Sequence, residues 1–272
     1  YFDSTSEYTI MASFDTIVHE ISHGYMAMEQ SHSTYFFVSR DESIRVPHTA
    51  VFRTSEIAGE FPDELRTFRF CYVDTDSPNL GAQVEGVYGL LDEMNAYYLG
   101  CKTSYDLYLY YLEEGPEADW QQFFTNINGT LYGIAEFKLY ILKYIMYAHE
   151  HYPEIYRGIV QNSDFRRAFK SIDENAYSFI AGYFCTKAGL LSDLRREGYA
   201  VEEDERYLSI GKGDNLQRNG HFLDTYNVIA EELAKPEYTA LVKYLAGGEG
   251  RPAYPYAEIP GASELHVADK AS

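Results

Sequence analysis

Apolar residues at helical spacing dominate the chain. Near the N-terminus, Ser4 and Glu7 have the spacing of a capping box, which marks the start of a helix. Apolar positions then recur every three or four residues, at Ile10, Phe14, Ile17, Val18, Ile21, Tyr25 and Met28. This pattern predicts one long helix that begins near Ser4 and continues to Met28.

The next segment changes character, because it is rich in Val, Phe, Tyr and Thr. Its composition predicts strands at 35–39, 46–54 and 67–74, separated by polar or proline-containing turns. Ser77-Pro78-Asn79 ends the last of these strands. Helical spacing then returns over residues 83–99.

From residue 104 onward the spacing is helical almost throughout. Apolar series over 137–148 and 177–191 predict two helices, and Pro153 is expected to stop the first of them. The spacing predicts two shorter helices over 222–234 and 237–245.

These elements predict an α+β fold that is mostly helical and contains a small β-sheet. We expect two lobes that meet near Gly100, one of residues 1–100 and a helical one of residues 101–246 that completes a cleft. No linker composition marks the boundary, so the lobes should share an interface. Residues 247–272 are rich in Gly, Ala and Pro, and predict a loosely ordered tail.

Composition narrows the range of partners. The 272 residues are 46% hydrophobic and 24% charged, which is typical of a globular protein and excludes a disordered chain. A formal net charge of −20 disfavours nucleic acids and anionic membranes but suits a divalent cation. No apolar stretch approaches the length of a membrane span. The three cysteines, Cys71, Cys101 and Cys185, are too few for a disulfide framework or a cysteine zinc site, and we expect buried thiols.

The most informative segment is His19-Glu20-Ile21-Ser22-His23, which has the form H-E-x-x-H. Residues four apart lie on one helix face, so both imidazoles can reach one Zn²⁺ ion. Glu20 lies about 100° around the helix, where a general base is needed. Shuffling predicts roughly 0.02 such matches in a chain of this composition. The alternative is a helix whose two histidines satisfy hydrogen bonds in the core.

A catalytic zinc site needs a third protein ligand and an open position for water. Glu29 lies where the metzincin pattern places a ligand, but that pattern requires Gly and His where this chain has Met26 and Glu29. We therefore set Glu29 aside. His32 is close in sequence but lies beyond the expected end of the helix.

The helix expected over residues 83–99 offers two better candidates, Asp92 and Glu93. Glu93 lies on a face of mostly small residues, which lets two helix backbones approach closely. The face comprises Gly86, Gly89 or Leu90, Glu93, Ala96 or Tyr97, and Gly100. Asp92 points about 100° away from that face. We therefore choose Glu93 as the third ligand, with Asp92 as the alternative.

His19-Glu20-x-x-His23 followed by Glu93 on a later helix resembles the gluzincin branch of the zincin metallopeptidases. The resemblance implies one Zn²⁺ ion held by His19, His23 and Glu93, with Glu20 as the general base. It also implies a zincin-like lobe over residues 1–100, in which a small β-sheet accompanies two metal-site helices. Thermolysin-like members have Asn before the ligand Glu and Asp four residues after it, whereas this chain has Asp92 and Tyr97.

Two supporting roles remain to be filled in such a site. An imidazole bound to zinc needs an acceptor for its other nitrogen, and Asp15, one turn before His19, is a candidate. Gluzincins tend to stabilise the oxyanion with a Tyr or a His. We nominate Tyr97, with Tyr98 and His221 as alternatives.

We therefore expect a zinc-dependent hydrolase, a gluzincin-like metalloendopeptidase that cleaves peptide or protein substrates with zinc-activated water. One alternative is a helical binding or scaffold protein with a structural or degenerate zinc site. Another is a hydrolase of non-peptide amides. Acidic zincins that lack their N-terminus are often exported, so we expect an extracytoplasmic or secreted protein, with a cytoplasmic location as the alternative.

Overall fold

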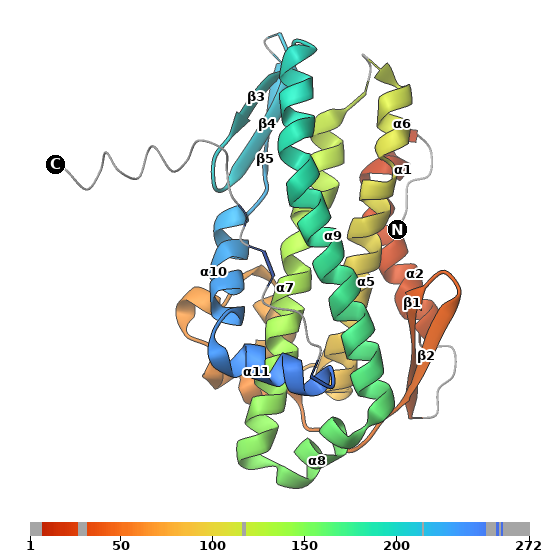
Figure 1. The fold of residues 1–272 in the computed structure, drawn as a ribbon, viewed down its shortest axis with the longest axis vertical. Helices are drawn as coiled ribbons and strands as arrows, with labels where there is room; N and C mark the ends of the chain where they lie inside the picture. Colours follow the sequence, from red (N-terminus) through yellow and green to blue (C-terminus); the bar gives the residue numbers. More distant parts are fainter. Residues whose placement is uncertain are drawn as a thin grey trace, which may run out of the picture.

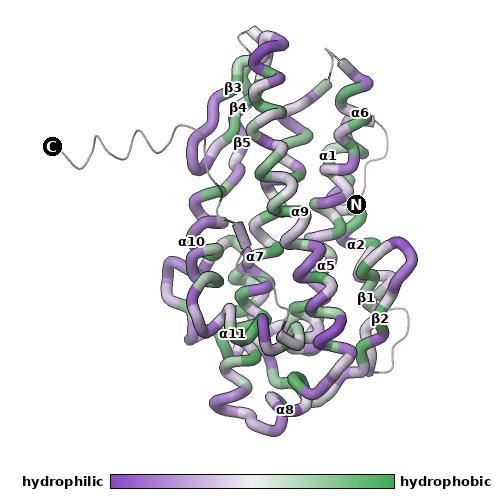
Figure 2. The backbone as a smooth tube through the Cα atoms, in the orientation of Figure 1, coloured by the Kyte–Doolittle hydropathy of each residue, from purple (hydrophilic) through white to green (hydrophobic). Residues whose placement is uncertain are grey.

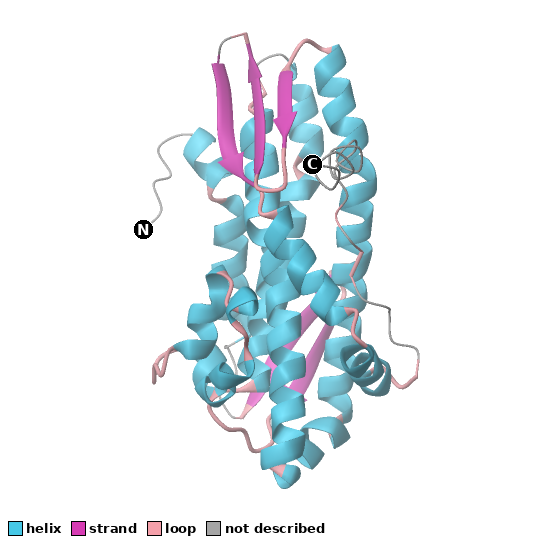
Figure 3. Ribbon diagram, turned by 90° about the vertical axis from the view of Figure 1, so that its left-hand side faces the viewer, coloured by secondary structure: helices cyan, strands magenta, loops and turns pink. Residues whose placement is uncertain are grey.

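A computed structural model describes residues 7–26, 32–115, 118–213, 215–248, 254–255 and 257. These residues form a mostly helical structure with two small antiparallel sheets, so the predicted α+β class is confirmed at that level (Figures 1 and 3). The two sheets lie toward opposite ends of the molecule. None of the helices in the described ranges combines the length and apolarity that a membrane crossing requires.

Three long helices form the centre of the molecule (Figure 1): α5 (Val87–Asp106), α7 (Trp120–His151) and α9 (Ser163–Arg196). The apolar series predicted over 137–148 and 177–191 lie within α7 and α9, and both helices are confirmed. Shorter helices cover this core, namely α6 (Tyr108–Glu113), α8 (Pro153–Gln161), α10 (Leu223–Leu233) and α11 (Pro236–Leu245).

The first predicted helix is interrupted. The structure has α1 (Glu7–Ala12) and α2 (Phe14–Met26), with a turn at Ser13 between them. The Ser13 amide donates to the carbonyl of Ile10, three residues earlier, at 3.2 Å. This bond closes a tighter turn than the bond to the fourth residue back that defines an α-helix. The predicted ends at Ser4 and Met28 lie outside the described residues.

A β-hairpin follows, formed by β1 (Ser33–Ser39) and β2 (Glu42–Pro47). Alternate side chains face inward, as the period of two requires, and Phe36 lies opposite Ile44 in the ladder with both side chains fully buried. The turn between the strands is hydrophilic (Figure 2). The hairpin is positioned by its contacts with α2, α5 and α9.

The strand predicted over 46–54 is wrong beyond Pro47, because the chain leaves the ladder there and enters η1 (Thr54–Glu60). Residue Phe52 explains the difference. Its ring stacks on Tyr144 of α7, and the Tyr144 hydroxyl accepts from the Phe52 amide at 2.8 Å and donates to the Phe52 carbonyl at 2.7 Å. One side chain therefore satisfies the backbone that a neighbouring strand would otherwise satisfy.

The strand predicted over 67–74 is also wrong, since this segment forms η3 (Phe68–Phe70) and α3 (Cys71–Asp74). Here the buried Glu136 carboxylate of α7 accepts from the Arg69 amide at 3.2 Å and from the Arg69 guanidinium at 2.8 Å. This ion pair fixes the segment against α7. Removing one partner of such a buried pair costs about 3–5 kcal/mol.

The second sheet was not predicted, because only helices were expected after residue 104. It consists of β3 (Ala200–Glu203), β4 (Tyr207–Lys212) and β5 (Asn215–Gly220). Its sequence gives a weak signal, since half of its residues are exposed and few are apolar. The Gln121 side chain of α7 holds β4 by accepting from the Ile210 amide at 2.6 Å and donating to the Leu208 carbonyl at 3.2 Å.

Three smaller expectations can be compared with the structure. Cys101 is buried, but Cys71 and Cys185 are exposed, so the expectation of three buried thiols is wrong for two. The lobe boundary predicted near Gly100 falls inside the continuous helix α5, and the division into lobes stays a prediction. Most of the tail over 247–272 lies outside the described residues.

Candidate metal centre

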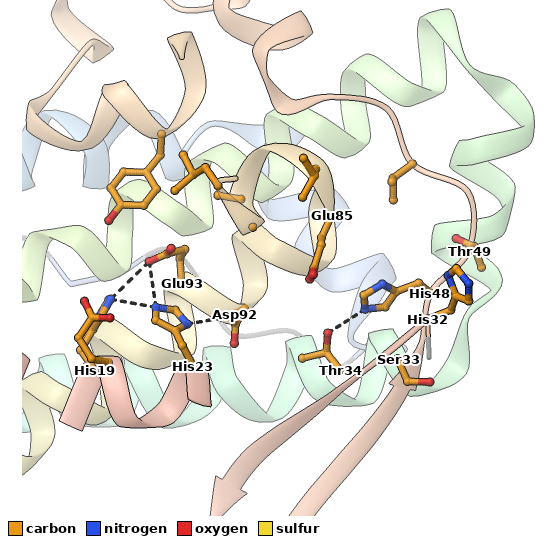
Figure 4. A pocket seen from close by; sticks show the side chains of 17 residues that line it. His19, His23, His32, Ser33, Thr34, His48, Thr49, Glu85, Asp92 and Glu93 are labelled. Carbon is orange, nitrogen blue, oxygen red and sulfur yellow. Dashed lines mark hydrogen bonds and ion pairs between the residues drawn. The ribbon is translucent and has the colours of Figure 1, made fainter. Parts of the chain in front are cut away.

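Two helices bring three potential metal ligands together (Figure 4). Helix α2 supplies His19 and His23, and α5 supplies Glu93. The Nε2 atoms of the two histidines lie 3.0 Å apart. The Glu93 Oε2 atom lies 3.5 Å from His19 Nε2 and 3.6 Å from His23 Nε2. The ligand set chosen from the sequence therefore converges on one point.

These separations suit a tetrahedral ion. Ligands about 2.0–2.1 Å from zinc are about 3.3–3.4 Å from one another in a tetrahedron, and the three distances bracket that value. Among the described residues, the buried Glu93 Oε2 atom has no hydrogen-bond partner. A buried carboxylate oxygen without a donor is costly, and a cation between the three groups would remove that cost. In the described part of the chain the ligand group has three members, so a tetrahedral ion held there would have one position open.

Asp92, the alternative ligand, contacts the His23 ring at Nδ1, whereas His19 lies at Nε2 of the same ring. The Asp92 Oδ2 atom is 2.8 Å from His23 Nδ1, so this bond keeps a proton on Nδ1 and reserves Nε2, which faces His19 and Glu93, for a metal ion. Asp92 thus occupies the orienting position that was expected of Asp15. Within the described ranges, Asp15 is buried and accepts a hydrogen bond from the Thr16 hydroxyl at 3.4 Å.

In the metal-free site the two imidazoles have very different pKa values. Burial, together with the neighbouring charges of His23 and Arg69, lowers the pKa of His19 to about 3. Burial alone would lower the pKa of His23 as well, but the hydrogen bond to Asp92 and the charges of Asp92 and Glu93 raise it to about 10. The pKa of Glu93 is raised by burial. One proton on the His23 ring therefore takes the place of a cation, and a metal ion would displace it.

The close approach of α2 and α5 depends on the small-residue face that the sequence predicts. A Cβ atom on Gly100 would lie 2.5 Å from the Asp15 carbonyl oxygen, one turn before His19. At Gly89 it would lie 2.3 Å from the Gly81 carbonyl oxygen. Glycine at Gly100 lets Glu93 on one helix reach the histidines on the other.

We expect Gly100→Ala to push α2 away from α5, because the added methyl group meets a backbone oxygen. Overpacking of this kind costs about 1–3 kcal/mol in the free energy of unfolding. It should also weaken zinc binding. Gly182→Ala is the matched control, since a Cβ at this helical position of α9 meets nothing within 4 Å. That change should stabilise the protein by about 0.5–1 kcal/mol. Urea unfolding and zinc titration of both variants test the expectation, and equal behaviour would contradict it.

The ligand group lies where two cavities meet. The larger, of about 800 Å³, is lined by the three ligands and Asp92 (Figure 4). Glu20 also lines it. The smaller, of about 230 Å³, shares His19 and Glu20 with it. Glu20 is exposed and is not a member of the ligand group. His32 also lines the larger cavity but is not a member of that group, and Glu29 lies outside the described residues.

The sequence nominated Tyr97 as an oxyanion donor, with Tyr98 and His221 as alternatives. The Tyr97 ring packs edge-on against the His19 imidazole, with centroids 4.4 Å apart, and lines the smaller cavity. Tyr98 is buried against Phe179 of α9. His221 does not line either cavity. It follows β5 and bonds to the Asp204 carbonyl through Nε2.

Tyr72 of α3 is a site residue that the sequence did not indicate. It lines both cavities, and burial together with the charge of Glu93 raises the pKa of its hydroxyl. The neutral hydroxyl can therefore act as a hydrogen-bond donor. Nothing in the sequence distinguishes this residue among the 27 tyrosines.

Comparison with known proteins finds no relative of this chain. No family model matches the chain, and neither a curated protein nor a solved structure matches it. The resemblance to the gluzincins therefore rests on the H-E-x-x-H motif and on the geometry around it, and a zincin-like lobe over residues 1–100 stays a prediction.

Proposed function

We propose that this protein is a zinc-dependent hydrolase, and specifically a metallopeptidase. The observation that carries the proposal is the convergence of His19 Nε2, His23 Nε2 and Glu93 Oε2, within 4.8 Å of one another, beside a large cavity. These residues would hold Zn²⁺, which supplies a Lewis acid that polarises a carbonyl group and lowers the pKa of water.

Glu20 is proposed as the general base. Its side chain lines both cavities and is accessible to water, so it can meet a substrate beside the ligand group. In peptide hydrolysis it takes a proton from the attacking water and later gives that proton to the leaving amine. Asp92 holds His23 in the required tautomer throughout, because its carboxylate accepts from Nδ1.

The size of the larger cavity supports a peptide as substrate. Its volume of about 800 Å³ is near the upper end of the range for small-molecule sites, which is about 300–1,000 Å³. A structural zinc site would be closed by a fourth protein ligand. The three-membered group in the described residues, open to a cavity, favours the enzyme over the scaffold alternative.

The Tyr72 hydroxyl is proposed as the oxyanion donor, and Tyr72→Phe tests this role. Loss of one such donor typically lowers kcat by about 10²–10³-fold. We expect that loss with KM and zinc content nearly unchanged, because the ring stays and no ligand is altered. Tyr98→Phe serves as the control, since Tyr98 lies outside both cavities. A Tyr72→Phe protein with full kcat would exclude the role.

A broad peptide library, analysed by mass spectrometry after incubation with zinc-loaded protein, tests the function itself. We expect cleavage that stops when zinc is chelated and returns when zinc is restored. If the protein holds one zinc ion but cleaves none of the peptides, the metallopeptidase proposal is wrong.

A further inference from the structure

The larger cavity has an excess of negative charge. Its described lining contains four carboxylates and no lysine or arginine. Glu93 belongs to the ligand group, Asp92 is bonded to His23, and Glu20 has the proposed proton-transfer role. Glu85 is the one carboxylate of the described lining to which the proposed mechanism gives no part.

The position of Glu85 is fixed by the backbone around it. It follows the short helix α4 (Gly81–Val84), and its amide donates to the Gly81 carbonyl at 2.9 Å. The next residue, Gly86, has φ +54° and precedes α5, and a Cβ atom there would lie 2.4 Å from the Tyr144 hydroxyl. Only glycine fits this turn, so the turn holds the Glu85 side chain at the cavity wall.

The Glu85 carboxylate lies in the cavity between the ligand group and His48 (Figure 4). In the described part of the chain no hydrogen bond or ion pair engages this carboxylate. The Glu85 side chain is exposed to the cavity, and partial desolvation together with the charge of Asp92 raises its pKa. A cation brought next to it would offset the repulsion from Asp92.

Beyond Glu85 the cavity wall carries His32, Ser33, Thr34, His48 and Thr49, and the His48 imidazole is uncharged near neutral pH. Burial, with a further contribution from His32, lowers the pKa of His48 to about 4. The His48 ring stacks on Tyr88 and bonds to the Thr34 hydroxyl at 2.8 Å. A substrate group at this end of the cavity therefore meets hydrogen-bonding partners and one negative charge.

We infer that this end of the cavity is a subsite for a positively charged substrate group, with Glu85 as its ion-pair partner. The group would be a lysine or arginine side chain or the free N-terminal amine of a peptide, since all three present N–H donors with positive charge. This inference rests on the proposed peptidase function and specifies the substrates that it prefers.

Peptides that differ only in Lys, Gln or Glu at one position, scanned on both sides of the scissile bond, test the subsite. We expect at least one position at which kcat/KM is about tenfold higher for Lys than for Gln, which corresponds to one well-formed ion pair. Acetylating the N-terminus distinguishes the two sources, because it removes the preference only if the amine is the group bound.

Two substitutions and a control complete the test. Glu85→Gln should remove the tenfold preference while keeping the zinc content and the cleavage of neutral peptides, and Glu85→Lys should favour Glu-containing peptides instead. Glu202→Gln is the control, because Glu202 is exposed in β3, in the sheet toward the other end of the molecule (Figure 1). If the protein cleaves peptides without regard to charge, or if Glu85→Gln keeps the preference for Lys, the proposed subsite is wrong. The proposed peptidase function is unaffected by either result. If no peptide is cleaved, the proposed function fails and the subsite with it.

Discussion

Replacing Glu20 with Gln is expected to abolish peptide cleavage while leaving one zinc ion bound. The amide cannot take a proton from water, and the loss of a general base lowers the rate by about 10²–10⁴-fold. Zinc should stay, because Glu20 is exposed and is not a member of the ligand group. Single-turnover cleavage of a library-selected peptide, with the zinc content measured on the same sample, gives both quantities.

The control for Glu20→Gln is Glu150→Gln, the same change at an exposed position near the end of α7. We expect this variant to behave as the unaltered protein does in both measurements. A Glu20→Gln protein that cleaves the peptide at the original rate would remove Glu20 from the mechanism. Loss of zinc in that variant would instead assign Glu20 to the ligand set.

Glu93→Gln and Asp92→Asn are expected to separate the two neighbouring carboxylates by their effect on zinc affinity. Glu93→Gln exchanges the unpartnered Oε2 carboxylate for a neutral amide, so zinc should be lost. Asp92→Asn keeps all three ligands and alters the acceptor behind His23, which typically weakens metal affinity by about 10–100-fold. Competition with a zinc chelator of known affinity measures both effects.

Thermal unfolding provides a second readout of the same pair of substitutions. Zinc at a thousandfold excess over its Kd stabilises the folded protein by about 4 kcal/mol. The unaltered protein should therefore show a zinc-dependent rise in Tm, which Glu93→Gln loses and Asp92→Asn shifts to higher zinc concentration. If instead Asp92→Asn loses zinc and Glu93→Gln keeps it, the two roles are reversed.

The candidate ligands could be predicted from the sequence because helical spacing fixes their directions. His19 and His23, four residues apart, must share a face, and the small residues around Glu93 allow the second helix to come close. The structure bears out that approach at Gly100, against the Asp15 backbone. The sequence could not predict the part played by Asp92, since this depends on the orientation of the His23 ring.

The two wrongly predicted strands have one cause. The segments at 46–54 and 67–74 have the composition of strands, yet side chains of α7 satisfy their backbone groups, through Tyr144 and Glu136. Such partners are distant in sequence, and local pattern carries no information about them. The same limit applies to Tyr72 and Glu85, which become cavity residues only when the helices are assembled.

Zinc X-ray absorption spectroscopy of the zinc-loaded protein tests the central claim most directly. Two imidazole nitrogens and two oxygens at about 2.0–2.2 Å are expected, the oxygens belonging to Glu93 and a water molecule. In His23→Ala the spectrum should lose one imidazole contribution. The proposal of a zinc hydrolase would be contradicted if the protein binds no zinc, or if protein groups occupy all four coordination positions of the ion.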